Sequence, residues 1–247
     1  MAHGRPGRSC YTLPVADSLR SPLLEGLGFR HAFSLRGVDP EAPADRGHIA
    51  ASLGCAPTAL HQCSQAHGAA VRRVLPGDDQ ASVRATEADA LIASGGAAAG
   101  VRVADCAAVL VVDPASGAVA AIHAGWRGTV RGVVAHAIAE LSASGSASVN
   151  FAAALFPHIR ACCFEVGEDV AAEIAAASLA RDVVVGGGAK PRVNLAAVIR
   201  MQLEQAGLAP ARIDDVPGCT KCEPARFFSY RRDGANAGRH LAAIASR

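Results

Sequence analysis

Long hydrophobic segments are absent from this sequence of 247 residues. No segment approaches the roughly 18 continuous apolar residues that a membrane-spanning helix needs, and residues 1–17 lack the apolar core of a signal peptide. These absences predict a cytoplasmic protein that makes no contact with a membrane. In a reducing compartment, the eight cysteines are not expected to form a disulfide framework.

Neither positive nor negative charge predominates in the sequence. The formal net charge is +2, and the charged residues make up 19% of the chain without forming runs. Because there is no basic stripe, binding to nucleic acid is not expected, although a small anionic ligand is compatible with this charge. The patterns GxGxxG and GxxxxGK[ST] are absent as well, so the glycine run of residues 186–188 is not interpreted as a nucleotide-binding loop.

Hydrophobic residues make up 51% of the chain, which is enough for a substantial core. Short apolar runs alternate with segments of helical periodicity, so strands and helices mix along the sequence. We expect residues 1–20 to form a loose lead-in and residues 21–247 to form a single domain. The expected strands are 29–35, 71–75, 109–112, 118–124, 151–156, 183–185, 227–234 and 240–244. The expected helices are 129–142, 166–177 and 194–206, and residues 57–62 are expected to form a helical turn.

Two of these strands should form a hairpin. The apolar runs of residues 109–112 and 118–124 flank the sequence Asp-Pro-Ala-Ser-Gly, which favours a turn. If the hairpin folds about the middle of residues 113–116, Cys106 lies opposite His123. Facing residues of an antiparallel pair are roughly 4.5–5.5 Å apart at Cα, so the thiol and the imidazole could share one metal ion or one proton.

Each of these two residues also has a simpler interpretation. Cysteine is often buried as a small hydrophobic residue, and a single histidine at a strand end is often structural. The segment that follows His123 contains two glycines and Arg127 just before the helix expected from Thr129. Such a segment suits an anion at the helix N-terminus, and this adds to the functional interpretation.

Five motifs in this order carry a resemblance to a known family. They are Gln-Ala-His-Gly at residues 65–68, Val-Ala-Asp-Cys at 103–106, His-Ala-Gly-Trp-Arg-Gly at 123–128, Cys-Cys-Phe-Glu-Val-Gly at 162–167 and the segment 227–234. Together they resemble the YfiH family, long labelled multicopper polyphenol oxidase or laccase-domain proteins. The resemblance implies an α+β fold, a layered α/β/β/α sandwich with mixed sheets. It also implies that His67, Cys106 and His123 bind a metal ion.

The family is associated with zinc-dependent purine nucleoside phosphorylase and adenosine deaminase activity. The resemblance therefore implies zinc as the metal, with copper as the less favoured choice, and a purine nucleoside and phosphate as substrates. Two histidines and one cysteine leave a fourth tetrahedral position on zinc open, as in catalytic sites. The resemblance also matches Arg36 to a family arginine, and Arg36 with Arg127 or Arg231 could bind phosphate.

Two departures from the family pattern lie near the expected substrate mouth. The Gly-Gly-Val-Ser that follows the family arginine is here Gly37-Val38-Asp39-Pro40, and the usual Gly-Pro is Phe156-Pro157. These changes bear on substrate preference rather than on the metal ligands.

Three other functions remain open. Cys106 and His123 could be the nucleophile and base of a cysteine hydrolase, since the fold also resembles that of certain bacterial toxin deamidases. A copper laccase is disfavoured because the sequence has no His-x-His pair, and neither Met1 nor Met201 is placed as an axial ligand to the three residues. The third alternative is a non-enzymatic module that binds a metal or a purine. The His-x-Glu signature of common zinc nucleobase deaminases is absent.

Four further cysteines need an explanation. Cys219 and Cys222 form a Cys-x-x-Cys pair, which could be half of a metal site or a redox pair, but no second Cys-x-x-Cys exists and a structural role is favoured. Cys162 and Cys163 are expected to fill the core. Trp126 could either line a purine pocket or anchor its loop.

Overall fold

The structure is a computed structural model that describes residues 18–247 except 76, 144, 179–182 and 187–188. Its strands are β1 (Ser18–Leu19), β2 (His31–Ser34), β3 (Leu60–His61), β4 (Val71–Val74), β5 (Ala90–Ala93), β6 (Ala98–Val103), β7 (Ala107–Val112), β8 (Val119–Ala124), β9 (Ala152–Leu155), β10 (Val184–Val185), β11 (Arg192–Val193), β12 (Ile213–Asp215) and β13 (His240–Ala245). Its α-helices are α1 (Pro22–Gly26), α2 (Pro43–Leu53), α3 (Gln80–Ala85), α4 (Trp126–Val130), α5 (Val133–Ser142), α6 (Glu168–Ala176), α7 (Leu195–Gln205) and α8 (Tyr230–Asp233).

Two mixed sheets contain most of these strands. The first has the order β1-β2-β13-β6-β3, in which only β3 and β6 are parallel. The second has the order β12-β9-β7-β8-β5-β4, with parallel pairs at both edges and antiparallel pairs between them. A separate ribbon pairs β10 with β11. Sequence neighbours β6 and β7 therefore belong to different sheets.

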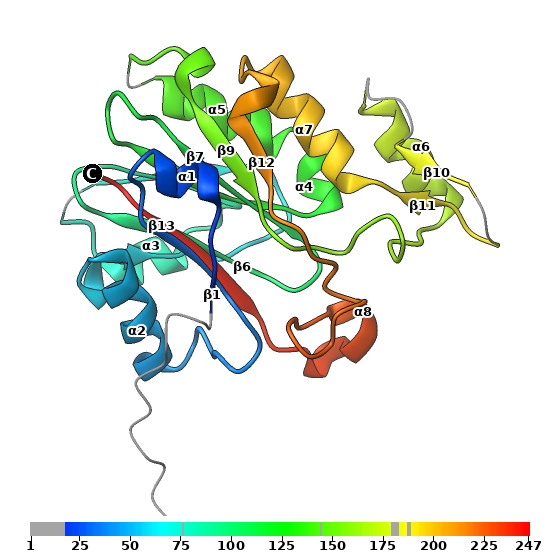
Figure 1. Cartoon of the computed structure of the whole chain (residues 1–247), viewed down its shortest axis with the longest axis horizontal. Coiled ribbons are helices and arrows are strands. Elements are labelled where there is room, and N and C mark those ends of the chain that lie inside the picture. The colour runs from blue at the N-terminus through cyan, green and yellow to red at the C-terminus, as the bar shows by residue number, and fades with distance from the viewer. Residues whose placement is uncertain (1–17, 76, 144, 179–182, 187–188) are drawn as a thin grey trace, which may run out of the picture.

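The two sheets stack face to face and bury a core between them. Phe33 of the first sheet belongs to the same apolar cluster as Leu91 and Leu110 of the second. On the outer side of the first sheet lies α2, which contributes Leu53, and on the outer side of the second lie α5 and α7. Figure 1 shows these helices on opposite sides of the sheets. The order of layers confirms the predicted α/β/β/α sandwich.

Burial on both faces explains why the central strands read as continuous apolar runs. Every residue of β7 and of β8 is buried, because one face of the second sheet meets the first sheet and the other meets helices. Strands with two covered faces need apolar residues throughout instead of an alternation. The hairpin predicted from these runs is confirmed.

Helix ends are predicted well where local side chains decide them. Asn194 caps α7 by accepting a hydrogen bond from Ala197 N at 3.2 Å, and Gly207, with φ +105°, follows the helix, as the sequence indicates. The single helix expected over residues 129–142 is wrong. Two helices, α4 and α5, replace it because Gly132 adopts the left-handed conformation between them.

Further elements also differ from the predictions. The segment 227–234 is not a strand, because Ser229 accepts a hydrogen bond from Arg232 N and so begins the short helix α8. Strand β6, which was not predicted as a separate element, pairs with β13 over its full length. Of the expected lead-in, residues 18 and 19 instead form β1 beside β2, and residues 1–17 lie outside the described residues.

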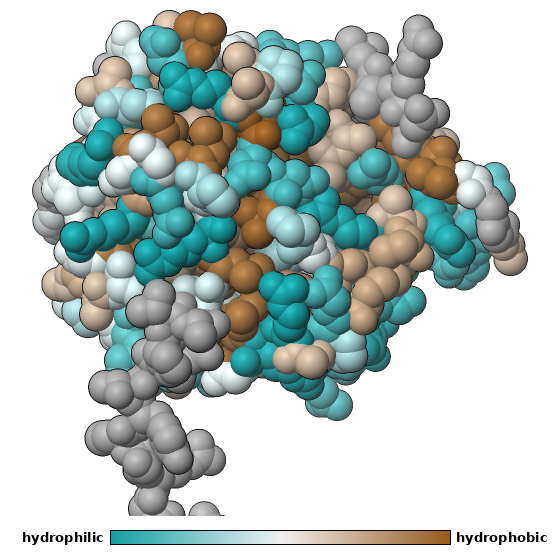
Figure 2. Space-filling view, in the orientation of Figure 1, coloured by the Kyte–Doolittle hydropathy of each residue, from teal (hydrophilic) through white to brown (hydrophobic). Residues whose placement is uncertain are grey.

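On the face seen in Figure 2, hydrophilic residues and small hydrophobic patches are interspersed. Within the described part of the chain, no helix is long and apolar enough to cross a membrane.

Phe33 offers a test of the packing between the sheets. Its side chain is fully buried, and its ring stacks on that of Phe156 with the centroids 5.6 Å apart. Phe33→Ala should lower the free energy of unfolding by about 3–5 kcal/mol, because it removes buried area and leaves a cavity. The exposed Val149 is the control, and Val149→Ala should change this energy by about 0.5 kcal/mol or less. Urea unfolding measures both, and equal effects would contradict the packing described.

Candidate metal centre

The hairpin of β7 and β8 sets the position of two candidate ligands. Its ladder pairs Ala108 with His123, and it closes where Asp113 N donates to Ala118 O. The predicted pairing of Cys106 with His123 is therefore wrong by two positions. The reason is that the loop closes between Asp113 and Ala118 instead of about the middle of residues 113–116. Cys106 precedes β7 and lies beside the segment that follows β8.

The three candidate ligands nevertheless converge. The ligand atoms of His67, Cys106 and His123 all lie within 4.8 Å of one another. The two imidazole rings form a T-shaped pair with their centroids 4.8 Å apart. His123 is buried, Cys106 is partly buried and His67 is exposed, so the cluster is accessible from one side.

Glycine is needed at two positions around this cluster. A Cβ atom at Gly125 would lie only 2.9 Å from Cys106 Sγ, and one at Gly128 would lie 2.7 Å from Gly68 O. Gly125 therefore allows the thiol to approach the histidines, and Gly128 allows α4 to pack against the turn that carries His67. The two glycines interpreted as an anion-binding loop thus have a packing role in the structure.

A buried carboxylate connects the two histidines. Asp89, just before β5, accepts a hydrogen bond from the backbone N–H of His67 at 2.9 Å and from that of Gly68 at 2.7 Å. The Nδ1 atom of His123 lies 2.7 Å from the same carboxylate. Because Nδ1–H donates to Asp89, the Nε2 atom of His123 is left free to bind a metal ion.

The sequence interpretation did not include Asp89 among the site residues. Only one signal pointed to it, namely an acidic residue at the start of the apolar segment that forms β5. Its partners lie more than 20 positions away along the chain. The residues next to Asp89 in the sequence therefore did not reveal its hydrogen-bond partners.

The charges of the cluster are strongly coupled. Burial by itself raises the pKa of the Cys106 thiol, but hydrogen bonds and charge from His123 and His67 outweigh it and lower the pKa to about 6. Burial lowers the pKa of His123, whereas hydrogen bonds with Asp89 and Cys106 raise it to about 9. At neutral pH the metal-free site therefore contains a thiolate next to an imidazolium.

A second carboxylate lies on the other side of Cys106. Asp105 has φ +83° and is buried. Its carboxylate accepts hydrogen bonds from Thr220 Oγ1, from Ser229 Oγ at 3.1 Å and from Arg231 N at 2.6 Å. Because these bonds hold the start of α8, they fix Arg231 beside the cluster. Asp105 is a second residue that the sequence interpretation did not single out.

The cluster opens into a cleft of about 690 Å³, a size typical of small-molecule sites. The cleft is lined by three aromatic side chains and four arginines, which are Trp126, Phe164, Tyr230, Arg102, Arg127, Arg231 and Arg239. Arg102 forms an ion pair with Glu41. Within the described ranges, Arg127 and Arg231 have no ion-pair partner, so their charge is available to an anion.

Arg36 lies outside the lining of this cleft. Its guanidinium donates to Pro224 O at 2.9 Å, lies 5.2 Å from the centroid of the Phe228 ring and is 4.0 Å from the carboxylate of Asp233. These contacts support the segment that leads into α8. The structure thus places Arg127 and Arg231 in the lining of the cleft, and Arg36 outside it.

Comparisons with known proteins agree with this geometry. The model of the family described as multi-copper polyphenol oxidoreductase laccase matches residues 38–247. The chain is 34% identical to the purine nucleoside phosphorylase of Deinococcus radiodurans over an alignment of 254 residues that covers 94% of each protein. It is 38% identical over 148 residues to the adenosine deaminase RL5 of an unknown prokaryotic organism. That alignment covers 59% of this chain and 56% of the deaminase, so the chain spans little more than half of that relative.

A solved structure shows the same fold. YlmD from Geobacillus stearothermophilus is 25% identical and has a TM-score of 0.86, with 96% of this chain and 98% of that chain covered. Together with the match over residues 38–247, this similarity confirms the resemblance carried by the five motifs. The chain belongs to the YfiH family, whose family model is described as multi-copper polyphenol oxidoreductase laccase.

Proposed function

We propose that this protein is a purine nucleoside phosphorylase with adenosine deaminase activity, and that His67, Cys106 and His123 hold Zn²⁺ in its active site. The observation that carries this proposal is the position of the three-residue cluster in a cleft lined by arginines. The names of two relatives, a purine nucleoside phosphorylase and an adenosine deaminase, support the substrate class.

The donor atoms fit zinc. Two imidazoles and one thiolate are ligands that zinc prefers, and the lowered pKa of Cys106 means that the thiolate is formed at neutral pH. When bound by three protein ligands, zinc keeps one position open, where it acts as a Lewis acid and activates water near neutral pH. Asp89 would orient His123 and hold the backbone of His67.

The remaining walls of the cleft suit the two substrates. Trp126, Phe164 and Tyr230 offer apolar faces against which a purine can pack. We assign phosphate binding to Arg127 and Arg231, which lack ion-pair partners among the described residues. Arg36 would contribute indirectly, by supporting the segment before α8.

Two reactions of one nucleoside would then compete. In phosphorolysis, a phosphate oxygen bonds to C1′ of the ribose, the bond from C1′ to the base breaks, and the base leaves with the electron pair and takes up a proton. In deamination, water adds at C6 of adenosine and ammonia leaves. Binding of phosphate by Arg127 and Arg231 would place the attacking oxygen near C1′ and so favour the first reaction.

A cysteine hydrolase is the second candidate. One specific observation favours it. The thiolate of Cys106 contacts the imidazolium of His123, which in turn contacts the orienting carboxylate of Asp89. This mechanism needs no contribution from His67. His67 therefore separates the two candidates.

Product analysis tests the proposed function. Adenosine supplied without phosphate should give inosine and ammonia, and added phosphate should divert the product to adenine and ribose 1-phosphate. Both activities should depend on zinc and should return when zinc is restored after chelation. Because the family model is named for copper, metal analysis should measure zinc and copper together. A product mixture that phosphate does not change would contradict the phosphorylase proposal.

His67→Ala provides the matched variant for this assay. It should reduce zinc content and both activities together, because a three-ligand site loses one ligand. His48, an exposed residue of α2, is the control, and His48→Ala should leave zinc content and activity unchanged. Full activity in metal-free His67→Ala protein would overturn the zinc assignment and favour the cysteine hydrolase.

Arg127 tests the assignment of phosphate binding. Arg127→Ala should raise the KM for phosphate about tenfold to a hundredfold, because a hydrogen bond between charged groups contributes about 1.5–3 kcal/mol. Deamination without phosphate should change little. Arg131→Ala is the control, since Arg131 lies just after the same helix, is exposed and does not line the cleft. If Arg36→Ala raises this KM as much as Arg127→Ala does, Arg36 binds phosphate directly and our assignment is wrong.

Asp89 tests how the ligands are held in place. Asp89→Asn should weaken zinc binding about tenfold to a hundredfold, because the amide can no longer accept every hydrogen bond that the carboxylate accepts. Competition with a chelator of known affinity measures the change. Asp169→Asn, an exposed change at the start of α6, should leave zinc affinity unaltered. Unchanged affinity in folded Asp89→Asn protein would show that this carboxylate does not position the ligands.

A further inference from the structure

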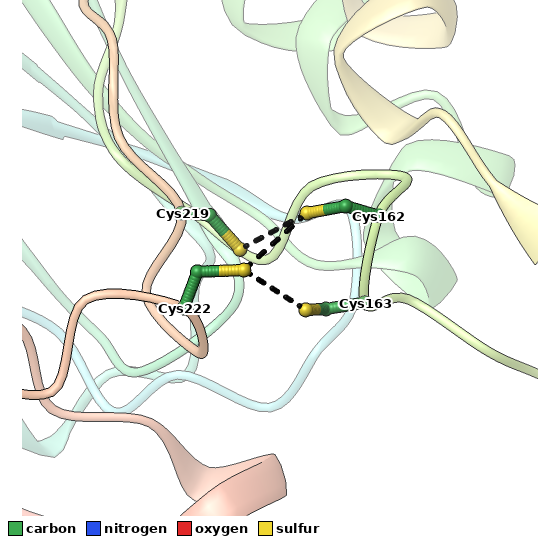
Figure 3. Close-up of side chains that lie close together, drawn as sticks. All are labelled: Cys162, Cys163, Cys219 and Cys222. Carbon is green, nitrogen blue, oxygen red and sulfur yellow. Dashed lines mark hydrogen bonds between the residues drawn. The ribbon is translucent and has the colours of Figure 1, made fainter.

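A second group of potential metal ligands lies outside the cluster of His67, Cys106 and His123. The thiols of Cys162, Cys163, Cys219 and Cys222 converge, as Figure 3 shows, and we call these four residues the cysteine quartet. Their sulfur atoms all lie within 4.8 Å of one another. The quartet joins the two sequence features that appeared unrelated, a vicinal pair and a Cys-x-x-Cys pair.

Sheet topology explains why two distant segments meet here. Strands β9 and β12 are parallel neighbours, so the loops that leave their C-terminal ends emerge at the same edge of the second sheet. A further bridge between His158 and Cys219 keeps the two loops together beyond the strands. The vicinal pair lies on the first loop and the Cys-x-x-Cys pair on the second.

Of the two residues expected to fill the core, Cys163 packs against the apolar cluster that covers the outer side of the second sheet, and Cys162 does not. Cys162 and Cys222 are exposed, Cys163 is partly buried, and only Cys219 is buried. The expectation that Cys162 fills the core is therefore wrong, because the turn that carries it faces the second loop at the surface. Thiols gathered at the surface can reach an ion from solution.

The distances between the sulfur atoms suit a tetrahedral metal site. Cys162 Sγ lies 3.6 Å from Cys219 Sγ and 3.6 Å from Cys222 Sγ, and Cys163 Sγ lies 3.2 Å from Cys222 Sγ. Four thiolates at about 2.3 Å from a zinc ion would be separated by about 3.8 Å. Only small adjustments would therefore bring the four sulfur atoms into this arrangement.

Backbone groups around the second loop also suit a bound thiolate. The backbone of Arg160, of Lys221 and of Cys222 forms hydrogen bonds with the thiol of Cys219. Such bonds stabilise negative charge on sulfur.

We propose that the cysteine quartet binds one thiophilic metal ion, such as Zn²⁺, in a closed four-sulfur site whose role is structural. Four protein ligands complete the tetrahedron, so no position is left for a substrate. The thiols would lose their protons when the ion binds. A tetrahedral site of four sulfur ligands selects zinc or iron over copper(II).

The site would fasten two walls of the cleft to each other. Phe164, which lines the cleft, directly follows Cys163 on the first loop. Thr220 lies between Cys219 and Cys222 on the second loop and donates a hydrogen bond to Asp105. A metal ion in the quartet would thus add a link between two segments that Arg160 already joins through hydrogen bonds to Asp215 and to Gly218 O.

The test uses the full chain with the first metal site disabled by Cys106→Ala. Protein purified under reducing conditions with zinc supplied should keep about one zinc or iron ion per chain. X-ray absorption at the edge of that metal should show four sulfur ligands at about 2.3 Å. This result does not depend on whether the protein is a phosphorylase, because no activity is measured.

Further substitutions in the Cys106→Ala protein identify the ligands. Adding Cys162→Ser or Cys222→Ser, both at exposed positions, should weaken the retention of the metal at least tenfold in competition with a chelator. Adding Cys55→Ser, a cysteine outside the quartet, should leave retention unchanged. Circular dichroism on each variant separates loss of metal from loss of fold.

Three outcomes would overturn the proposal. The first is Cys106→Ala protein that holds no metal even with zinc supplied. The second is an absorption spectrum with nitrogen or oxygen ligands in place of four sulfurs. The third is a mass lower by two hydrogens for each pair of quartet thiols under the same reducing conditions, which would identify disulfides instead of a metal site.

Discussion

The candidate metal centre depends on the hydrogen bonds that the buried carboxylate of Asp89 accepts. Asp89 is only 1% exposed, and it accepts hydrogen bonds from three successive backbone N–H groups, of residues 66–68, as well as from the ring of His123. A buried charge without partners would cost several kcal/mol, and these hydrogen bonds offset that cost. One carboxylate thus joins the turn that carries His67 to the strand that carries His123.

Asp105, the residue before Cys106, likewise joins distant segments of the chain through its carboxylate. It ties the start of α8 and the loop of Thr220 to the segment between β6 and β7, which crosses from one sheet to the other. Two carboxylates therefore hold the segments around the cleft, namely Asp89, which contacts His123, and Asp105, which precedes Cys106. Apart from the bond between Asp89 and His123 of β8, the hydrogen bonds that build the site are made by residues outside the strands, and the stacked sheets fix where the connecting loops begin and end.

The residues by themselves predicted local structure but not long-range pairing. The apolar runs predicted the hairpin, and Asn194 and Gly207 predicted the ends of α7, whereas the convergence of His67, Cys106 and His123 was implied only by the family resemblance. The register failed because it depends on a hydrogen bond between Asp113 and Ala118 that composition does not specify. Asp89 and the cysteine quartet were missed because their partners lie far away in the sequence, and the pairing of β9 with β12 is visible only in the fold.

The account rests on a metal ion at the first cluster, and anomalous X-ray diffraction from crystals of the zinc-loaded protein tests this most directly. Data on the two sides of the zinc absorption edge should give a peak about 2.0–2.3 Å from the ring nitrogens of His67 and His123 and from Cys106 Sγ. The His123 contact should be made by Nε2, with Nδ1 still facing Asp89. A map with no zinc peak in contact with these three residues would contradict the account.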